Sequence, residues 1–75
     1  MYDVYLFFDN QFRGLSDSIH NLEYDLMCET VHNYASQGGY IRIRNNETGV
    51  TLEFDSDTYF NSGRYYYEGD INIDI

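Results

Sequence analysis

Residues 16–39 read SDSIHNLEYDLMCETVHNYASQGG, and the spacing of apolar residues in this stretch decides the fold class. On a helical wheel one broad arc is apolar and the opposite arc is polar. A serine is available as N-cap at the start, and Gly38-Gly39 is suited to end a helix. We therefore predict one amphipathic helix over roughly residues 17–36. Its apolar arc holds Leu15, Ile19, Leu22, Leu26, Met27, Thr30, Val31 and Tyr34, and its polar arc holds Asp17, Ser18, Asn21, Asp25, Cys28, Glu29 and His32.

The sequence around this helix is typical of strands. Residues 2–8, YDVYLFF, favour a strand with two largely apolar faces, which suits a central position in a sheet. Residues 40–44 and 50–55 alternate around a turn and predict a β-hairpin. In this hairpin, Arg42 and Arg44 share a face with Thr51, Glu53 and Asp55, so cross-strand ion pairs are expected.

The C-terminal part of the sequence predicts a closing strand. Residues 56–63 are rich in turn formers, and residues 64–75 read RYYYEGDINIDI. We expect one interrupted strand or two short ones over 64–68 and 70–75, with Gly69 as a bulge. The predicted fold is a single α+β domain over residues 1–75, in which one helix packs on a small three- to four-stranded, mostly antiparallel sheet in the order β-α-β-β-β.

Composition narrows the function classes. The 75 residues hold thirteen Asp and Glu against four Arg and no Lys, a net charge of −9, yet 43% are hydrophobic and 19% aromatic. This balance indicates a folded domain that repels nucleic acid and anionic membranes and attracts basic protein surfaces. The N-terminus has no signal-peptide pattern, no apolar stretch reaches membrane-spanning length, and Cys28 is the only cysteine. We expect a cytoplasmic protein without direct nucleic-acid or membrane contact.

No catalytic, metal or cofactor motif stands out. Cys28 and His32 are spaced i, i+4 with Asp25 nearby, but a cysteine late in a helix among carboxylates lacks the electropositive setting of a reactive thiol. Asp55 and Asp57 begin like a calcium loop that then fails at its later ligand positions. The two histidines have no paired ligands at zinc spacing. We therefore predict a protein that is not an enzyme.

Regularly spaced carboxylates are the remaining functional signal. Same-face residues of a strand lie about 6.6 Å apart, so acidic residues along strands present rows of negative charge, as nucleic-acid phosphates do. Nine tyrosines supply large contact area with polar tips. The predicted partner-binding residues, with one of the tyrosines 65–67 as anchor, are Asp55, Asp57, Tyr66, Glu68, Asp70 and Asp74.

In overall character the sequence resembles the small acidic anti-defence inhibitors of phages and mobile elements, including anti-CRISPR proteins and DNA mimics. It is short, acidic, lysine-free and tyrosine-rich. The resemblance implies a stoichiometric inhibitor of a basic, nucleic-acid-binding host protein, such as a CRISPR effector, a restriction enzyme or another nuclease. Two alternatives stay open: a homo-oligomeric module that pairs strand edges across a two-fold axis, and a soluble domain whose acidity only keeps it in solution.

Overall fold

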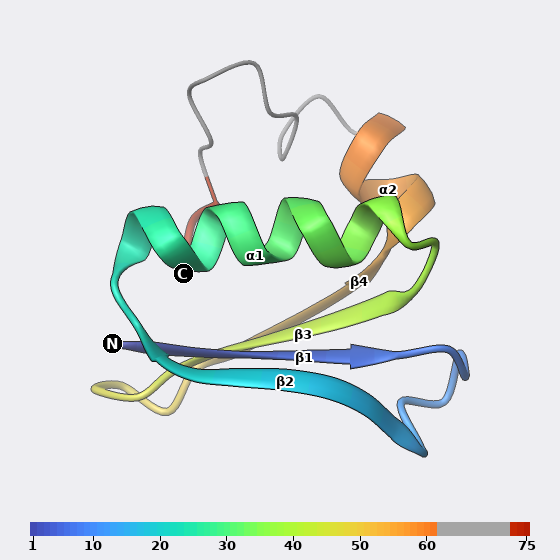
Figure 1. Cartoon of the computed structure of the whole chain (residues 1–75). Helices are drawn as coiled ribbons and strands as arrows, with labels where there is room; N and C mark the ends of the chain where they lie inside the picture. The colour runs from blue at the N-terminus through green and yellow to red at the C-terminus, as the bar shows by residue number, and fades with distance from the viewer. Residues whose placement is uncertain (62–72) are drawn as a thin grey trace.

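A computed structural model of the protein describes residues 1–61 and 73–75. The element order is β1 (Tyr2–Phe7), β2 (Leu15–Leu22), α1 (Tyr24–Ser36), β3 (Tyr40–Asn45), β4 (Thr51–Asp55) and α2 (Ser56–Asn61). The strands form one antiparallel sheet in the order β2-β1-β3-β4, and α1 lies across one face of it (Figure 1). The predicted α+β class is confirmed, and β1 lies inside the sheet as its two apolar faces predicted.

The predicted helix over 17–36 is wrong in its first third, because residues 15–22 form β2 and α1 begins at Tyr24. The error has a physical cause in two register shifts between β1 and β2. Ile19 pairs with Val4 and Leu22 with Tyr2, so the extra residue between them returns both to the same face of the sheet. A strand with such bulges repeats its apolar residues every three or four positions, as a helix does. The observed order is therefore ββαββα, not β-α-β-β-β.

The corrected start of the helix also changes which of its residues are buried. When residues 15–22 are left out, the apolar arc on the helical wheel shifts. The buried face of α1 consists of Met27, Cys28, Val31, Tyr34 and Ala35. These side chains pack on Val4, Leu6, Ile41 and Ile43 of the two central strands. Cys28, which was placed on the polar arc, is therefore in the core at 2% exposure, and Leu26, which was placed on the apolar arc, is 50% exposed.

The predicted hairpin over residues 40–55 is confirmed by β3 and β4. Arg42 pairs directly with Glu53 in the register, and its Nη2 lies 2.7 Å from the Glu53 carboxylate, as expected for a cross-strand ion pair. On this face, which α1 does not cover, the loop between β1 and β2 folds back over the sheet. Phe12 contacts the rings of Phe7 and Tyr40, with centroids 5.6 and 5.9 Å apart, so Phe7 is buried.

The chain after β4 differs from the sequence prediction. The predicted turn over 56–63 is instead the short helix α2 through Asn61, with Tyr59 buried against Phe54. Of the predicted closing strand, most lies outside the described residues. Residues 73–75 are not in a strand, but Ile73 is buried in the hydrophobic core.

Asp55 begins α2 by capping it. Its Oδ1 accepts the backbone N–H of Thr58 at 2.8 Å, and hydrogen bonds from the Thr58 hydroxyl and from this N–H lower the pKa of Asp55. We expect Asp55→Ala to lower the free energy of unfolding by about 1 kcal/mol, because an N-cap is lost. The matched change is Asp57→Ala, at an exposed position in the first turn of α2. It should lower the free energy of unfolding by less than about 0.5 kcal/mol, since it removes only a charge that interacts with the helix dipole. Urea unfolding measures both, and equal losses would contradict the capping role.

Candidate functional site

Of the predicted contact residues, the structure describes Asp55, Asp57 and Asp74, and these three do not form one row. Asp55 is half-buried and occupied as a helix cap, while Asp57 and Asp74 are exposed. Figure 1 shows α2 beside the C-terminal end of α1 and the chain terminus beside its first turns, so Asp57 and Asp74 lie at different ends of that helix. Tyr66, Glu68 and Asp70 lie outside the described residues.

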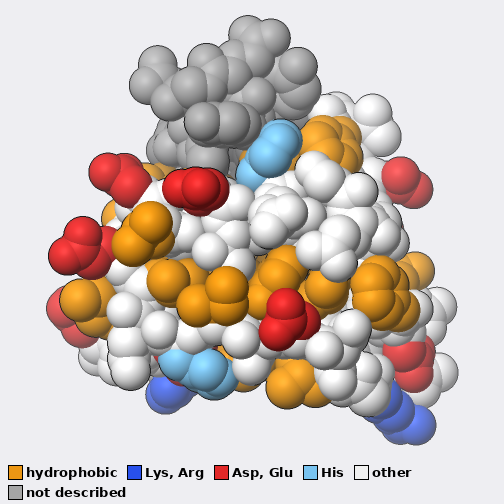
Figure 2. Space-filling view, viewed as in Figure 1, with side chains coloured by type: hydrophobic (Ala, Val, Ile, Leu, Met, Phe, Trp, Pro, Cys, Tyr) orange, Lys and Arg blue, Asp and Glu red, His pale blue; other side chains and the backbone are white. Residues whose placement is uncertain are grey.

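The structure instead gathers carboxylates along the first half of α1. Asp25 and Glu29 are exposed and one helical turn apart, and Glu23 is the exposed N-cap residue of the same helix. Asp74 joins this region because Ile73 exchanges two hydrogen bonds with the Tyr24 hydroxyl, at 2.9 and 3.0 Å. Acidic side chains are prominent over this part of the molecule in Figure 2. We call Glu23, Asp25, Glu29 and Asp74 the acidic surface.

The positive charges of the described residues lie elsewhere. Neither α1 nor α2 contains Lys or Arg. Arg42 is on the opposite face of the sheet, where Glu53 pairs with it and its guanidinium stacks over the Phe7 and Phe12 rings at 5.2 and 5.6 Å. Arg44 shares that face and donates to Asn46. No ion pair joins the acidic surface to a cationic group among residues 1–61 and 73–75.

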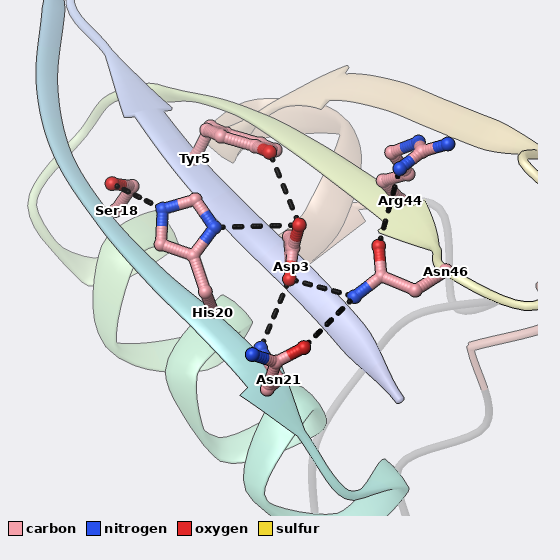
Figure 3. A network of polar contacts seen from close by, with 7 residues as sticks. All are labelled: Asp3, Tyr5, Ser18, His20, Asn21, Arg44 and Asn46. Atoms are coloured by element: carbon pink, nitrogen blue, oxygen red, sulfur yellow. Dashed lines mark hydrogen bonds and ion pairs between the residues drawn. The ribbon is translucent and has the colours of Figure 1, made fainter.

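A second cluster of polar groups holds β2 beside this surface, centred on Asp3 (Figure 3). Asp3 is the one charged residue among the buried side chains of the described part, at 8% exposure. One oxygen accepts the backbone N–H of Asn21 at 2.9 Å and the side-chain amide of Asn46 at 2.8 Å. The other lies 3.3 Å from both the Tyr5 hydroxyl and the His20 Nδ1. The carboxylate thus fills the bulge of β2 and ties it to β1 and to the turn after β3.

The backbone at this bulge explains why a carboxylate is needed. Asn21 has φ of +57°, the left-handed region that asparagine tolerates better than most residues, and its N–H points at Asp3 instead of a strand partner. Burial alone would raise the pKa of Asp3, but hydrogen bonds from Asn46, Asn21 and His20 outweigh it and lower the pKa from 3.8 to about 2. The ionised carboxylate is therefore the form that the fold requires.

His20 also contacts Ser18, and this gives the cluster the atom order of a serine nucleophile set. Ser18 Oγ lies 3.1 Å from His20 Nε2, and His20 Nδ1 faces Asp3. The backbone N–H of Ser18, however, donates to the Asp17 carboxylate at 2.9 Å. A carboxylate in that place opposes the negative charge that develops on a carbonyl under attack. We assign the cluster a structural role that keeps β2 in register.

Cys28 and His32, the other candidate catalytic side chains, both pack within the fold. Cys28 is buried, and burial raises the pKa of its thiol, which disfavours the nucleophilic thiolate. His32 Nδ1 lies 3.0 Å from the Tyr59 hydroxyl, a contact between α1 and α2. The described residues contain no group of three or more potential ligands placed to hold a metal ion. None of their helices has the length and apolarity to cross a membrane.

Removing the Asp3 charge tests this cluster. We expect Asp3→Asn to lower the free energy of unfolding by about 2 kcal/mol near pH 6, because the charge is lost and the new NH2 group faces hydrogen-bond donors such as the Asn21 N–H and the Asn46 amide. Because the native pKa of about 2 lies below the unfolded value of 3.8, the stabilisation is complete above about pH 4 and is lost as the pH falls through about 2. Urea unfolding from pH 6 to pH 2 should show the wild-type advantage shrinking. Asp9→Asn, in an exposed turn, is the control, and a difference that is constant with pH would contradict the assignment.

Comparison with known proteins gives no match to a family model, to a curated protein or to a solved structure. A function has to be inferred from the geometry of this protein itself. That geometry offers a surface of carboxylates that form no ion pair within the described residues, next to a strand that the buried carboxylate of Asp3 holds in place.

Proposed function

We propose that the protein is a stoichiometric inhibitor that binds a basic, nucleic-acid-binding protein through the acidic surface on α1. The observation that carries the proposal is the separation of charge. Exposed Asp25, Glu29 and Asp74 lie on the helical side, while Arg42 and Arg44 lie on the opposite face of the sheet. A net charge of −9 speeds the encounter with a basic groove, and the carboxylates of the acidic surface replace phosphates within it.

The positions on the helix fit this role. Asp25 and Glu29 follow one another by a single turn, a spacing of about 6 Å along the helix. This is close to the rise of about 6.8 Å along the axis between alternate phosphates on one nucleic-acid strand. A host nuclease, such as a CRISPR effector or a restriction enzyme, presents the complementary row of Lys and Arg side chains. Inhibition then consists of occupying the groove, and no reaction at the inhibitor is required.

The test is inhibition of DNA cleavage by a panel of purified CRISPR effectors and restriction endonucleases. We expect at least one enzyme to lose activity at equimolar inhibitor, with an affinity that falls steeply between about 50 and 500 mM salt. The double variant Asp25→Asn, Glu29→Gln should weaken this inhibition about tenfold or more, because two charges leave the contact. Circular dichroism checks that α1 is intact.

The matched control removes the same charge elsewhere. Asp9→Asn with Glu47→Gln neutralises two exposed carboxylates outside the acidic surface, one in the loop after β1 and one in the turn after β3. This double variant should keep its affinity within about twofold, because only the long-range attraction changes. Equal weakening by both double variants would show that net charge alone is responsible. Inhibition that does not depend on salt would contradict charge mimicry.

A further inference from the structure

β2 is a long strand with one free edge. It is the outermost strand of the sheet, and in the described part of the chain its outer side pairs with no other strand. It is eight residues long, and six of its side chains are exposed. Free strand edges are templates for another chain, and proteins use them to bind extended segments.

Apolar side chains border the edge on the side of α1. Ile19 is 42% exposed and Leu26 is 50% exposed, with half-buried Leu22 between them in the sequence. The bulge at His20 and Asn21 brings Ile19 and Leu22 to this same side of the strand. Figure 2 shows an apolar band that runs across the molecule between α1 and β2. Contiguous exposed apolar surface of this kind is typical of a protein contact.

Charge around the band selects a partner that is basic. Residues 15–36 contain no Lys or Arg, and Asp17 lies on the strand beside Ile19. The acidic surface adjoins the other end of the band through Glu23 and Asp25. A second copy of the protein would bring another Asp17 and another net charge of −9 to the edge, and like charges placed opposite one another destabilise a strand pair.

Asp17 on this side of β2 is an exposed carboxylate that lies against Tyr34 of α1. Tyr34 is 2% exposed, and burial, then the charge of Asp17 and a hydrogen bond to it, raise the pKa of Tyr34 to about 12. Asp17 also accepts the backbone N–H of its neighbour Ser18. Because a carboxylate accepts several hydrogen bonds, Asp17 can also bind a cationic donor from a partner.

We propose that the free edge of β2 binds an extended segment of the basic partner, with a Lys or Arg on Asp17 and apolar side chains on Ile19 and Leu26. This inference rests on the proposed function and names how the partner is held. The partner segment adds a strand to the sheet through main-chain hydrogen bonds, and its Lys or Arg side chain forms an ion pair with the carboxylate of Asp17. The acidic surface then attracts the basic groove, and the apolar band supplies the lasting contact.

A synthetic strand tests the proposal without the partner. The probe is a peptide of about ten residues that alternates Arg and Val, compared with the same peptide N-methylated at every backbone amide. NMR hydrogen exchange reports protection of each amide of the full-length protein. We expect the unmodified peptide to protect amides of residues 15–22 and to bind about tenfold more tightly than the methylated peptide. Ile19→Ala and Leu26→Ala should each weaken binding about threefold or more, because apolar contact area is lost.

Val50→Ala is the matched control, since Val50 is 54% exposed beside the opposite edge strand, and it should leave peptide affinity unchanged. Equal binding of both peptides, or protection only outside residues 15–22, would overturn the proposal. So would light scattering that shows a dimer whose β2 amides are protected without peptide. Nuclease inhibition without protection of β2 overturns only this strand-pairing proposal. Protection of β2 by the peptide without inhibition of any nuclease overturns only the proposed function.

Discussion

A buried carboxylate holds the edge of this sheet in place. Asp3 sits on the central strand β1 and binds the Asn21 N–H of β2 and the Asn46 amide beyond β3, so one side chain joins three segments. In a domain of 75 residues the core is small, and the exposed strand β2 contributes little to it. The hydrogen bonds to Asp3 therefore stabilise the position of β2, whereas the central strands are stabilised by burial of their apolar side chains. The directions of Ile19 and Leu22, and so the apolar band, follow from this bond.

Sequence reasoning identified the class and the central strands because those elements follow simple periods. The alternation in β1, β3 and β4 has period two, and Met27, Val31 and Tyr34 follow the helical period. β2 was misassigned because its bulges imitate a helical period, and no local signal in LSDSIHNL reveals that Asp3, eighteen positions before Asn21, completes the strand. The positive φ of Asn21 marks the bulge, but this angle is visible only in the structure. The cap at Asp55 was missed because α2 is too short to show a periodic pattern.

The candidate site was harder to predict than the fold. A count of carboxylates shows that the protein is acidic, but it does not show which of them are already occupied. Asp3 and Asp55 serve the fold, and Glu53 is paired with Arg42. Asp25 and Glu29 are exposed and form no ion pair in the part of the chain that is described. The distinction depends on tertiary contacts, so a surface for a basic partner emerges only once the paired charges are set aside. The same separation relates the two proposals: charge attracts the partner, and the strand edge with its apolar border holds it.

The position of β2 depends most on the contact between Asp3 and the Asn21 amide, and NMR observes this contact directly. The chemical shift of the Asn21 amide proton should follow the titration of Asp3, with a midpoint at about pH 2, and the amide should be protected from exchange near neutral pH. Nuclear Overhauser effects over residues 15–22 should connect them across to β1. A midpoint near the unperturbed value of 3.8, or helical i to i+3 effects through residues 15–22, would contradict the account.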